Sequence, residues 1–239
     1  MQILPPISAP LRGGYLNSAA VTVEISDGEW AVYGIEWQDT SCGCAAEFPI
    51  CAPHTKSQSN APTKSTAAPV GIESSYACTP PFPRADLQAM AARVVDISTE
   101  DRVAFNVAVQ LAALPPATLL PGVYGLAQGL AVLLTAVYAA GRGIIHLNPY
   151  DLALLMERNM IIVDSSGNVS SAIGGHNMIA NPYVAAGLLI FTGYAKVLLS
   201  TIQPVSTFDH LTNIQREGAE RHLAIALNSC GARQVAVAL

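Results

Sequence analysis

The sequence contains few charged residues. Asp, Glu, Lys and Arg make up only 12% of its 239 residues, about half of the roughly 25% that is usual in soluble domains. Much of the surface that faces water in other proteins must therefore be covered here, which favours assembly into a larger particle. Lysine occurs three times, no run of Lys or Arg is present, and the net charge is −5. These features argue against a protein that binds nucleic acid by displacing counterions.

Aromatic residues are also scarce, at 6%, whereas the chain has 18 glycines, 16 prolines and a hydrophobic share of 51%. This composition is too apolar for a disordered chain and predicts tightly packed cores of small side chains in one or two domains. Residues 1–10 lack the basic start and apolar run of a cleaved signal. The most apolar stretch, 125–140, is shorter than the roughly 20 residues that span a bilayer, and it predicts a buried helix.

The sequence contains five cysteines, and this odd number excludes a complete disulfide framework. They are Cys42, Cys44, Cys51, Cys78 and Cys230. The first three, together with His54, have the ligand types that zinc accepts, but their spacing matches no common structural zinc motif. Reduced thiols in a loop at an interface are the favoured interpretation, and zinc binding is the alternative.

The first third of the chain divides into two parts. Alternating apolar and polar residues over 15–37, with a tight turn at Asp27-Gly28, predict a β-hairpin. Residues 41–83 contain seven prolines and show almost no periodicity. A structureless loop of this length is unusual inside a compact domain, so we expect this segment to reach towards neighbouring chains. A disordered linker is the alternative.

The rest of the sequence alternates between helix and strand signals. Apolar residues every three or four positions predict a long helix over 84–114, which the acid-containing stretch Ser98–Asp101 could split into two. Helices are also expected at 126–140 and, capped by Asn148-Pro149, through residue 158. The expected strands are 143–147, 160–163, 188–191, 196–201, 221–228 and 234–239. The chain is therefore predicted to be α+β, with antiparallel sheet in its last fifth.

No catalytic spacing is present among the five histidines. His146 lies between two apolar residues, so we interpret it as a hydrogen-bonded strand residue and not as a general base. The densest charge cluster, 216–221, contains Glu217, Glu220 and Arg221 and is expected just before a strand, where salt bridges between strands or subunits are the simplest role. We expect Gly174-Gly175 to form a turn, because no phosphate-loop context surrounds it. The sequence thus predicts neither an enzyme nor a cofactor or metal site.

The order of the expected elements resembles the Hong Kong 97-type major capsid proteins of tailed phages, a fold shared by encapsulins. More specifically, it resembles short capsid proteins of phages that infect actinobacteria. The resemblance covers residues 70–239 and depends on the approach from Cys78 to the helix that begins at Arg84, and on the segments 143–149, 191–197 and 213–239. It implies an α+β capsid fold with a long spine helix, a peripheral domain and an axial domain.

The resemblance also implies a division of the chain and a function. The parts would be an N-terminal arm at 1–40, an extended loop at 41–83, the spine helix and peripheral domain at 84–121, the axial domain at 122–185, and closing strands at 186–239 that return to the peripheral domain. A major capsid protein self-assembles from hexamers and pentamers into an icosahedral head that encloses double-stranded DNA. Its location would be the virion, assembled in the host cytoplasm without a membrane, with portal, scaffold or decoration proteins as partners.

The interface residues expected on this basis are Cys42, Cys44, Lys56, Lys64, Cys78, Arg84, Glu217, Glu220 and Arg221. Some shells of this lineage crosslink a loop lysine to an asparagine, but the polar surroundings of the two loop lysines here keep their ammonium groups solvated, so noncovalent locking is expected. Two alternatives remain. Another virion component, such as a tail or connector protein, would share the composition. A cysteine-dependent hydrolase that uses Cys230 or Cys78 would require a reactive thiol.

Overall fold

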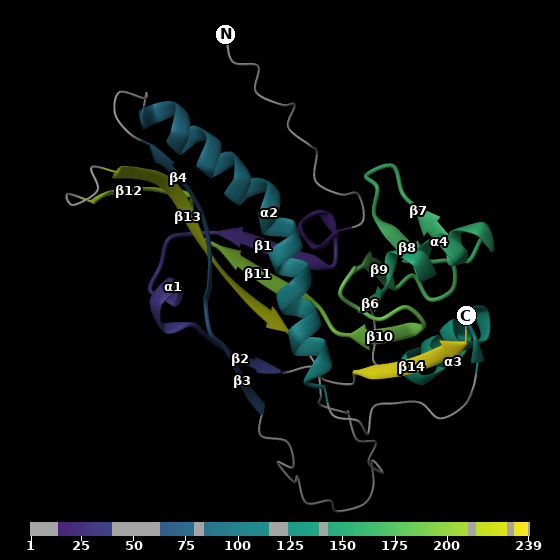
Figure 1. Cartoon of the computed structure of the whole chain (residues 1–239). Coiled ribbons are helices and arrows are strands. Elements are labelled where there is room, and N and C mark those ends of the chain that lie inside the picture. The colour runs from purple at the N-terminus through teal and green to yellow at the C-terminus, as the bar shows by residue number, and fades with distance from the viewer. Residues whose placement is uncertain are drawn as a thin grey trace, which may run out of the picture.

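The computed structural model describes residues 14–39, 63–78, 84–114, 124–138, 143–209, 214–228 and 232–238. Figure 1 shows a long helix, α2, lying across one sheet, with a second sheet and two shorter helices beside it. The candidate zinc ligands Cys42, Cys44, Cys51 and His54 lie outside the described residues. Among the described helices, none is both long enough and apolar enough to cross a membrane.

The long helix is continuous. α2 spans Arg84–Ala112, which confirms the long helix predicted from the sequence, and the possible break at 98–101 does not occur. The Ser98 and Thr99 hydroxyls donate to the carbonyl of Val95, at 3.1 and 2.8 Å. Because these side chains bond backward within the helix, they do not cap a new one. One unbroken helix therefore runs along the sheet.

The five-stranded sheet is organised around β13, Ile214–Leu227. β4 (Val70–Cys78) pairs antiparallel along one edge of β13, and β12 (Gln203–Asp209) and β11 (Ala195–Leu199) pair antiparallel along the other. β1 (Val21–Ile25) adds parallel to β11. β13 begins seven residues before the strand predicted at 221, so the charge cluster lies within the strand and not ahead of it.

The predicted hairpin over 15–37 is wrong. β1 pairs with β11, whereas the next strand, β2 (Ile35–Asp39), follows the short helix α1 (Trp30–Tyr33) and pairs with β3 (Thr63–Ala67). The Asp27 carboxylate accepts hydrogen bonds from the amide and hydroxyl of Thr201, at 2.8 and 2.6 Å. The turn is thus attached to the end of β11, and the chain leaves the sheet instead of folding back along β1.

The second sheet has seven strands in the order β5-β14-β10-β6-β9-β8-β7. Their bounds are Tyr124–Gly125, Arg233–Ala238, Leu188–Thr192, Ile144–Leu147, Asn177–Ala180, Val169–Ser171 and Ile161–Val163. β10 and β14 pair with each other, and they also pair with β6 and β5, respectively. The closing strands are therefore divided between the two sheets.

The cap of α4 agrees with the sequence prediction, and a side-chain carboxylate stabilises a turn nearby. α4 spans Pro149–Glu157, and the Asn148 side chain accepts from the amide of Tyr150 at 2.9 Å, which confirms the predicted cap. In the turn that follows β7, the Asp164 carboxylate accepts from the amides of Ser166 and Asn168, at 2.8 and 2.9 Å. A carboxylate that bonds to the amide two residues on mimics a backbone turn, which is why such residues favour this position.

α3, Leu126–Val137, provides much of the second core. Its buried face consists of Leu126, Gly129, Leu130, Leu133, Leu134 and Val137. The leucine and valine side chains of this face join a cluster with residues of β6, β10 and β14, separate from the core beneath α2. The spacing of three and four residues places this face against the sheet, and the buried helix predicted from the sequence is confirmed.

Replacing Leu133 with alanine should lower the free energy of unfolding by about 2 to 5 kcal/mol, because the leucine side chain is fully buried and its removal leaves a cavity. Denaturant unfolding of the purified protein measures this loss. Thr135→Ala, at an exposed position of the same helix, is the control and should change the value by less than about 0.5 kcal/mol. A loss below about 1 kcal/mol at Leu133 would contradict this helix orientation.

Candidate assembly surfaces

A two-stranded ribbon extends from the body of the subunit. β2 and β3 pair antiparallel over five residue pairs, from Ile35 opposite Ala67 to Asp39 opposite Thr63. Figure 1 shows this ribbon at the lower end of the molecule, pointing away from both sheets. Lys64 lies on β3, and residues 40–62, which connect the two strands, lie outside the described residues with Cys42, Cys44 and Lys56. A projecting ribbon of this kind can contact a neighbouring molecule.

Glu217 is fully buried between α2 and the first sheet. Its carboxylate accepts hydrogen bonds from the Gln88 side chain of α2 at 2.7 Å, from the Ser206 hydroxyl of β12 at 3.0 Å, and from the side chain of Gln215. A buried charge requires such partners, because an unsatisfied carboxylate is expensive to remove from water. The carboxylate thus connects the helix with two strands of its own subunit.

Arg221 is buried on the same side of the sheet. Its Nε donates to the carbonyl of Ser200 at 3.1 Å, and one terminal nitrogen contacts Thr99 at 3.3 Å and Asp96 at 3.4 Å, both on α2. Contacts within the subunit therefore occupy both Glu217 and Arg221. Glu220, the third charged residue predicted in this cluster, is only partly buried and lines the opposite face of the strand.

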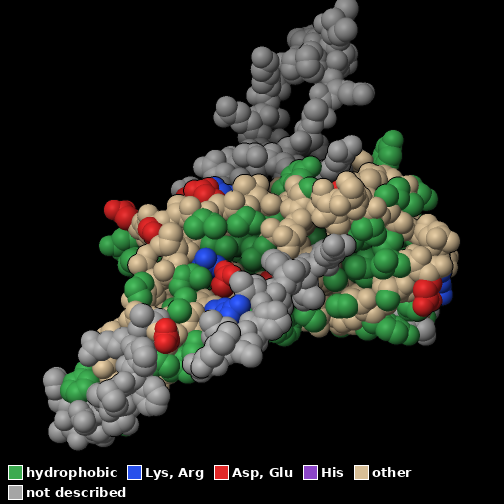
Figure 2. All heavy atoms as spheres, turned by 90° about the horizontal axis from the view of Figure 1, so that it is seen from above, with side chains coloured by type: hydrophobic (Ala, Val, Ile, Leu, Met, Phe, Trp, Pro, Cys, Tyr) green, Lys and Arg blue, Asp and Glu red, His purple; other side chains and the backbone are tan. Residues whose placement is uncertain are grey.

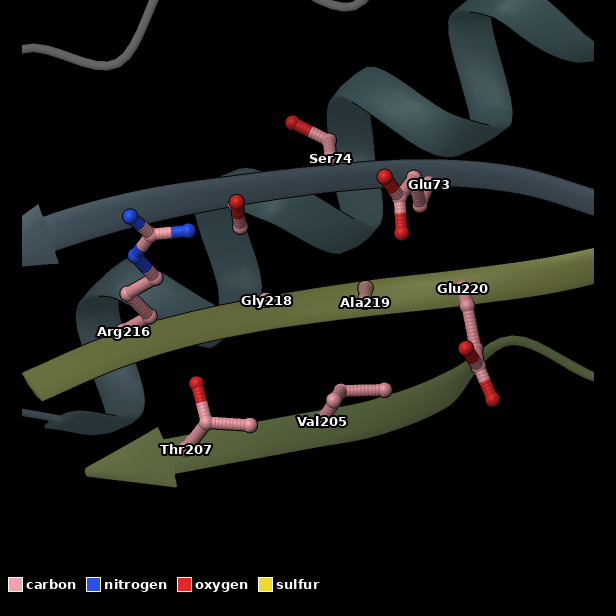
Figure 3. Close-up of a pocket in the computed structure, with 9 residues that line it drawn as sticks. Glu73, Ser74, Val205, Thr207, Arg216, Gly218, Ala219 and Glu220 are labelled. Atoms are coloured by element: carbon pink, nitrogen blue, oxygen red, sulfur yellow. The ribbon is translucent and has the colours of Figure 1, made fainter. Parts of the chain in front are cut away.

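The face of β4, β13 and β12 that lies away from α2 contains a shallow cavity of about 180 Å³ (Figure 3). Its floor is Gly218, in the middle of β13, flanked by Ser75 of β4 and Val205 of β12 in the same row across the sheet. A Cβ atom at Gly218 would lie 2.8 Å from the carbonyl oxygen of Ser74. A glycine inside a strand is a position where another backbone or a ligand can approach closely.

Charge is distributed unequally around this cavity. Arg216 and Thr207 border one end, and Glu73 and Glu220 border the other, with Gly218 between them (Figure 3). Glu73 and Glu220 are direct register partners on neighbouring strands. Two like charges directly opposite each other destabilise a strand pair. The face therefore has a positive end and a negative end, and the negative end would gain from an added positive charge.

The remaining outer surface has few charged groups. Figure 2 shows hydrophobic side chains spread over the described surface seen from above, with a few groups of acidic and basic side chains among them. On α2, Val94, Ile97, Phe105 and Val109 are each more than 40% exposed. Exposed apolar side chains of this number agree with the low charge of the sequence and favour contact with other molecules.

A buried polar cluster joins the N-terminal segment to both sheets. Tyr15, in the short helical turn η1 (Tyr15–Asn17), is fully buried, and its hydroxyl lies 2.8 Å from Nδ1 of His146 on β6. Asn181, after β9, donates to the same hydroxyl at 3.0 Å and to the carbonyl of Ala104 on α2 at 2.9 Å. Glu100 of α2 accepts from the amides of Tyr15 and Leu16, at 2.6 and 3.0 Å.

The hydrogen-bond pattern determines which nitrogen of His146 carries the proton. Nε2 lies 2.7 Å from the Thr192 hydroxyl, which itself donates to the carbonyl of Gly193 at 3.1 Å. Thr192 must then accept from Nε2–H, so Nδ1 is free to accept from Tyr15. Complete burial lowers the pKa of His146 to about 3, and burial raises the pKa of Glu100. The interpretation of His146 as a hydrogen-bonded structural residue is confirmed.

Comparison with solved structures relates this architecture to known proteins. The holo-SrpI encapsulin complex from Synechococcus elongatus PCC 7942 aligns over 99% of this chain and 92% of its own, with 10% identity and a TM-score of 0.54. A structure of Mycobacterium phage Che8 aligns over 98% and 96%, with 10% identity and a TM-score of 0.52. The chain has the Hong Kong 97-type capsid fold. No protein-family model and no curated protein matches the sequence.

The capsid fold predicted from the sequence is thus confirmed. Of the predicted interface residues, those in the described ranges can be located on it. Cys78 ends β4, and Arg84 begins α2. The structure also brings together residues that the sequence analysis did not select, namely Glu73, Ser75, Val205, Thr207 and Arg216. The available signal was the alternation along 215–221: Gln215, Glu217, Ala219 and Arg221 are buried, and the residues between them line the cavity. In the described ranges, no three His, Cys, Asp or Glu side chains are grouped to hold a metal ion.

Proposed function

We propose that this chain is the major capsid protein of a tailed-phage-type particle, and that copies of it assemble into a closed shell around double-stranded DNA. The observation that carries the proposal is the fold correspondence, which extends over almost the whole of this chain and of the two solved chains. The low charge and the exposed apolar side chains are properties of a subunit with several faces to cover.

The parts of the chain can be assigned roles on this basis. The ribbon of β2 and β3, with the connecting residues 40–62, would be the extended loop that lies over a neighbouring subunit. α2 with the five-stranded sheet would form the peripheral domain. The seven-stranded sheet, including β10 and β14, would form the axial domain around the five- and six-fold axes. Portal, scaffold and decoration proteins would be further partners in the virion.

Purified protein should form closed particles of uniform size, because a subunit with these surfaces gains stability only when its faces are covered. Gel filtration and negative-stain electron microscopy measure this directly. Wild-type protein that remains a small species over all concentrations and salt conditions would contradict the proposal. Such a result would favour a different role for a chain with this fold.

Shortening the ribbon should separate folding from assembly. We expect a variant in which residues 42–60 are replaced by a short Gly-Ser linker to keep the circular dichroism spectrum and unfolding midpoint of the wild type, because β2 and β3 remain. Its particle yield should fall at least about tenfold, because contacts with the neighbouring subunit are lost. Normal particle formation would show that the segment is only a linker.

A protein compartment shell is the second candidate, favoured by the similarity to the encapsulin complex. The two functions differ in what the particle contains. Particles from the native source should contain nuclease-protected double-stranded DNA if the shell is a phage head. Particles that contain a protein cargo and no protected DNA would favour the compartment.

A further inference from the structure

We propose that residues 14–19, the junction segment, hold the second sheet in one position relative to α2 and the first sheet, and that this position sets the curvature of the shell. The segment lies beside α2, between the two sheets, and leads into β1 of the first sheet (Figure 1). The part of the inference that concerns curvature rests on the proposed function. The part that concerns the junction is a property of the single chain.

The chain connections between the two sheets do not determine how the sheets lie. β10 continues into β11 through residues 193–194, and β13 continues into β14 through residues 228–232. Units joined by such connections move relative to each other unless their interface opposes the motion. Ile144, Ile179 and Ile190 of the second sheet join the core beneath α2, but hydrophobic contact is non-directional. Directed hydrogen bonds therefore have to define the position.

The junction segment makes directed hydrogen bonds on both sides. On one side, Glu100 of α2 accepts from two consecutive amides of the segment. On the other side, the Tyr15 hydroxyl bonds His146 of β6 at 2.8 Å, and the amide of Ala19 donates to the side-chain oxygen of Asn168 at 3.0 Å. Asn168 follows β7 and precedes β8. The segment thus connects the long helix to two places on the second sheet.

Asn181 connects all three parts at one buried side chain. Its amide nitrogen donates to the Tyr15 hydroxyl and to the Ala104 carbonyl of α2, and its side-chain oxygen accepts from the amide of Tyr183 at 2.9 Å. The Tyr183 hydroxyl then donates to Asp101 of α2 at 2.8 Å. A shift of the second sheet along α2 would break these bonds and leave buried polar groups unpaired, which is costly. The network therefore favours one position.

This position matters in a shell, because contacts with other copies involve both sheets of each subunit. Every copy repeats the same contacts, so a small rotation between the sheets is repeated around the particle. Small rigid-body rotations of packed units are a general way in which assemblies change shape. A junction that allows one position favours one curvature, whereas a loosened junction permits several.

Tyr15→Phe tests the junction, because it removes the hydroxyl that bonds His146 and Asn181 and keeps the buried ring. In the purified protein, hydrogen–deuterium exchange of the amides at 15–20 should be at least about tenfold faster than in the wild type, since exchange reports local opening. In negative-stain micrographs, wild-type particles should form one size class. The variant should form at least two.

The control is Val137→Ala, in the buried face of α3 and in the separate core cluster of the second sheet. It lowers stability but leaves the junction hydrogen bonds in place. Its amides at 15–20 should therefore exchange as in the wild type, and its particles should keep one size class. Circular dichroism checks the folding of each variant.

Tyr183→Phe is a second variant that does not depend on a buried position. It removes only the hydroxyl that donates to Asp101, from a side chain that is 45% exposed, so it should fold as the wild type does. It should also increase the number of size classes, because one bond between the second sheet and α2 is lost.

The outcomes separate this inference from the proposed function. Wild-type exchange at 15–20 in Tyr15→Phe would overturn the role of the junction. One size class in both tyrosine variants, or several in Val137→Ala, would overturn the link to curvature and leave the shell function intact. Wild-type protein that forms no particles would overturn the shell function and the link to curvature, whereas the exchange measurement would still decide whether the segment holds the two sheets.

Discussion

Replacing Tyr15 with alanine should lower the free energy of unfolding by about 3 to 5 kcal/mol, the range for removing a large aromatic side chain from a core. The tyrosine ring is fully buried and stacks with the ring of His146, with centroids 5.7 Å apart. Its hydroxyl also bonds His146 and Asn181, which would lose a buried partner. Denaturant unfolding of the unassembled subunit measures the change.

Tyr15→Phe separates the contribution of the hydroxyl from that of the ring. It keeps the buried volume and removes only the two hydrogen bonds, so the expected loss is about 1 to 3 kcal/mol. Tyr33→Ala, at a position that is 82% exposed, is the surface control and should cost less than about 0.5 kcal/mol. If Tyr15→Ala and Tyr33→Ala had equal effects, the N-terminal segment would not be part of the folded core.

Subunit stability should fall by about 2 kcal/mol between about pH 7.5 and pH 5 because of His146. Its pKa is about 3 in the folded chain and ordinarily 6.5, so the unfolded chain binds more protons in this range. Stability is therefore complete above the ordinary pKa and is lost as the pH falls below it. A protonated Nδ1 would donate to Tyr15, whose own hydroxyl proton would then have no acceptor.

The matched variant for this prediction is His146→Gln, which can accept from Tyr15 and donate to Thr192 but does not titrate. The difference in stability between wild type and variant should shrink as the pH is lowered. The raised pKa values of Glu100 and Asp151 act in the opposite direction and are shared by both proteins, so they cancel in the comparison. If the variant fails to fold, nuclear magnetic resonance of the wild-type imidazole provides the check. Titration near pH 6.5 would contradict the prediction.

Local signals in the sequence predicted the local structure. The apolar spacing of 84–114 indicated the long helix, and Asn148-Pro149 indicated the start of α4, because both depend on neighbouring residues. The hairpin failed because a distant residue, Thr201, holds the turn at Asp27. Alternation shows that a segment is a strand but not which strand lies beside it.

The candidate surfaces were less predictable, because they combine residues that are far apart in the sequence. The polar cluster combines Tyr15, Glu100, His146 and Asn181, which are widely separated in the sequence and share no motif. The charges at 216–221 were recognised, but their separation onto two faces follows only from the start of β13 at Ile214. Glu217 and Arg221 turn towards α2, whereas Arg216 and Glu220 line the outer cavity.

The strand pairing has a consequence for how the subunit folds during synthesis. β1 pairs with β11, and β5 pairs with β14, so each sheet combines strands from early and late parts of the chain. Pairings between residues far apart in sequence slow folding, because a long loop must close before the contact forms. Neither sheet can be completed on the ribosome until its late strand has emerged. Prematurely terminated chains would lack these pairings and would expose the unpaired edges of β1 and β5.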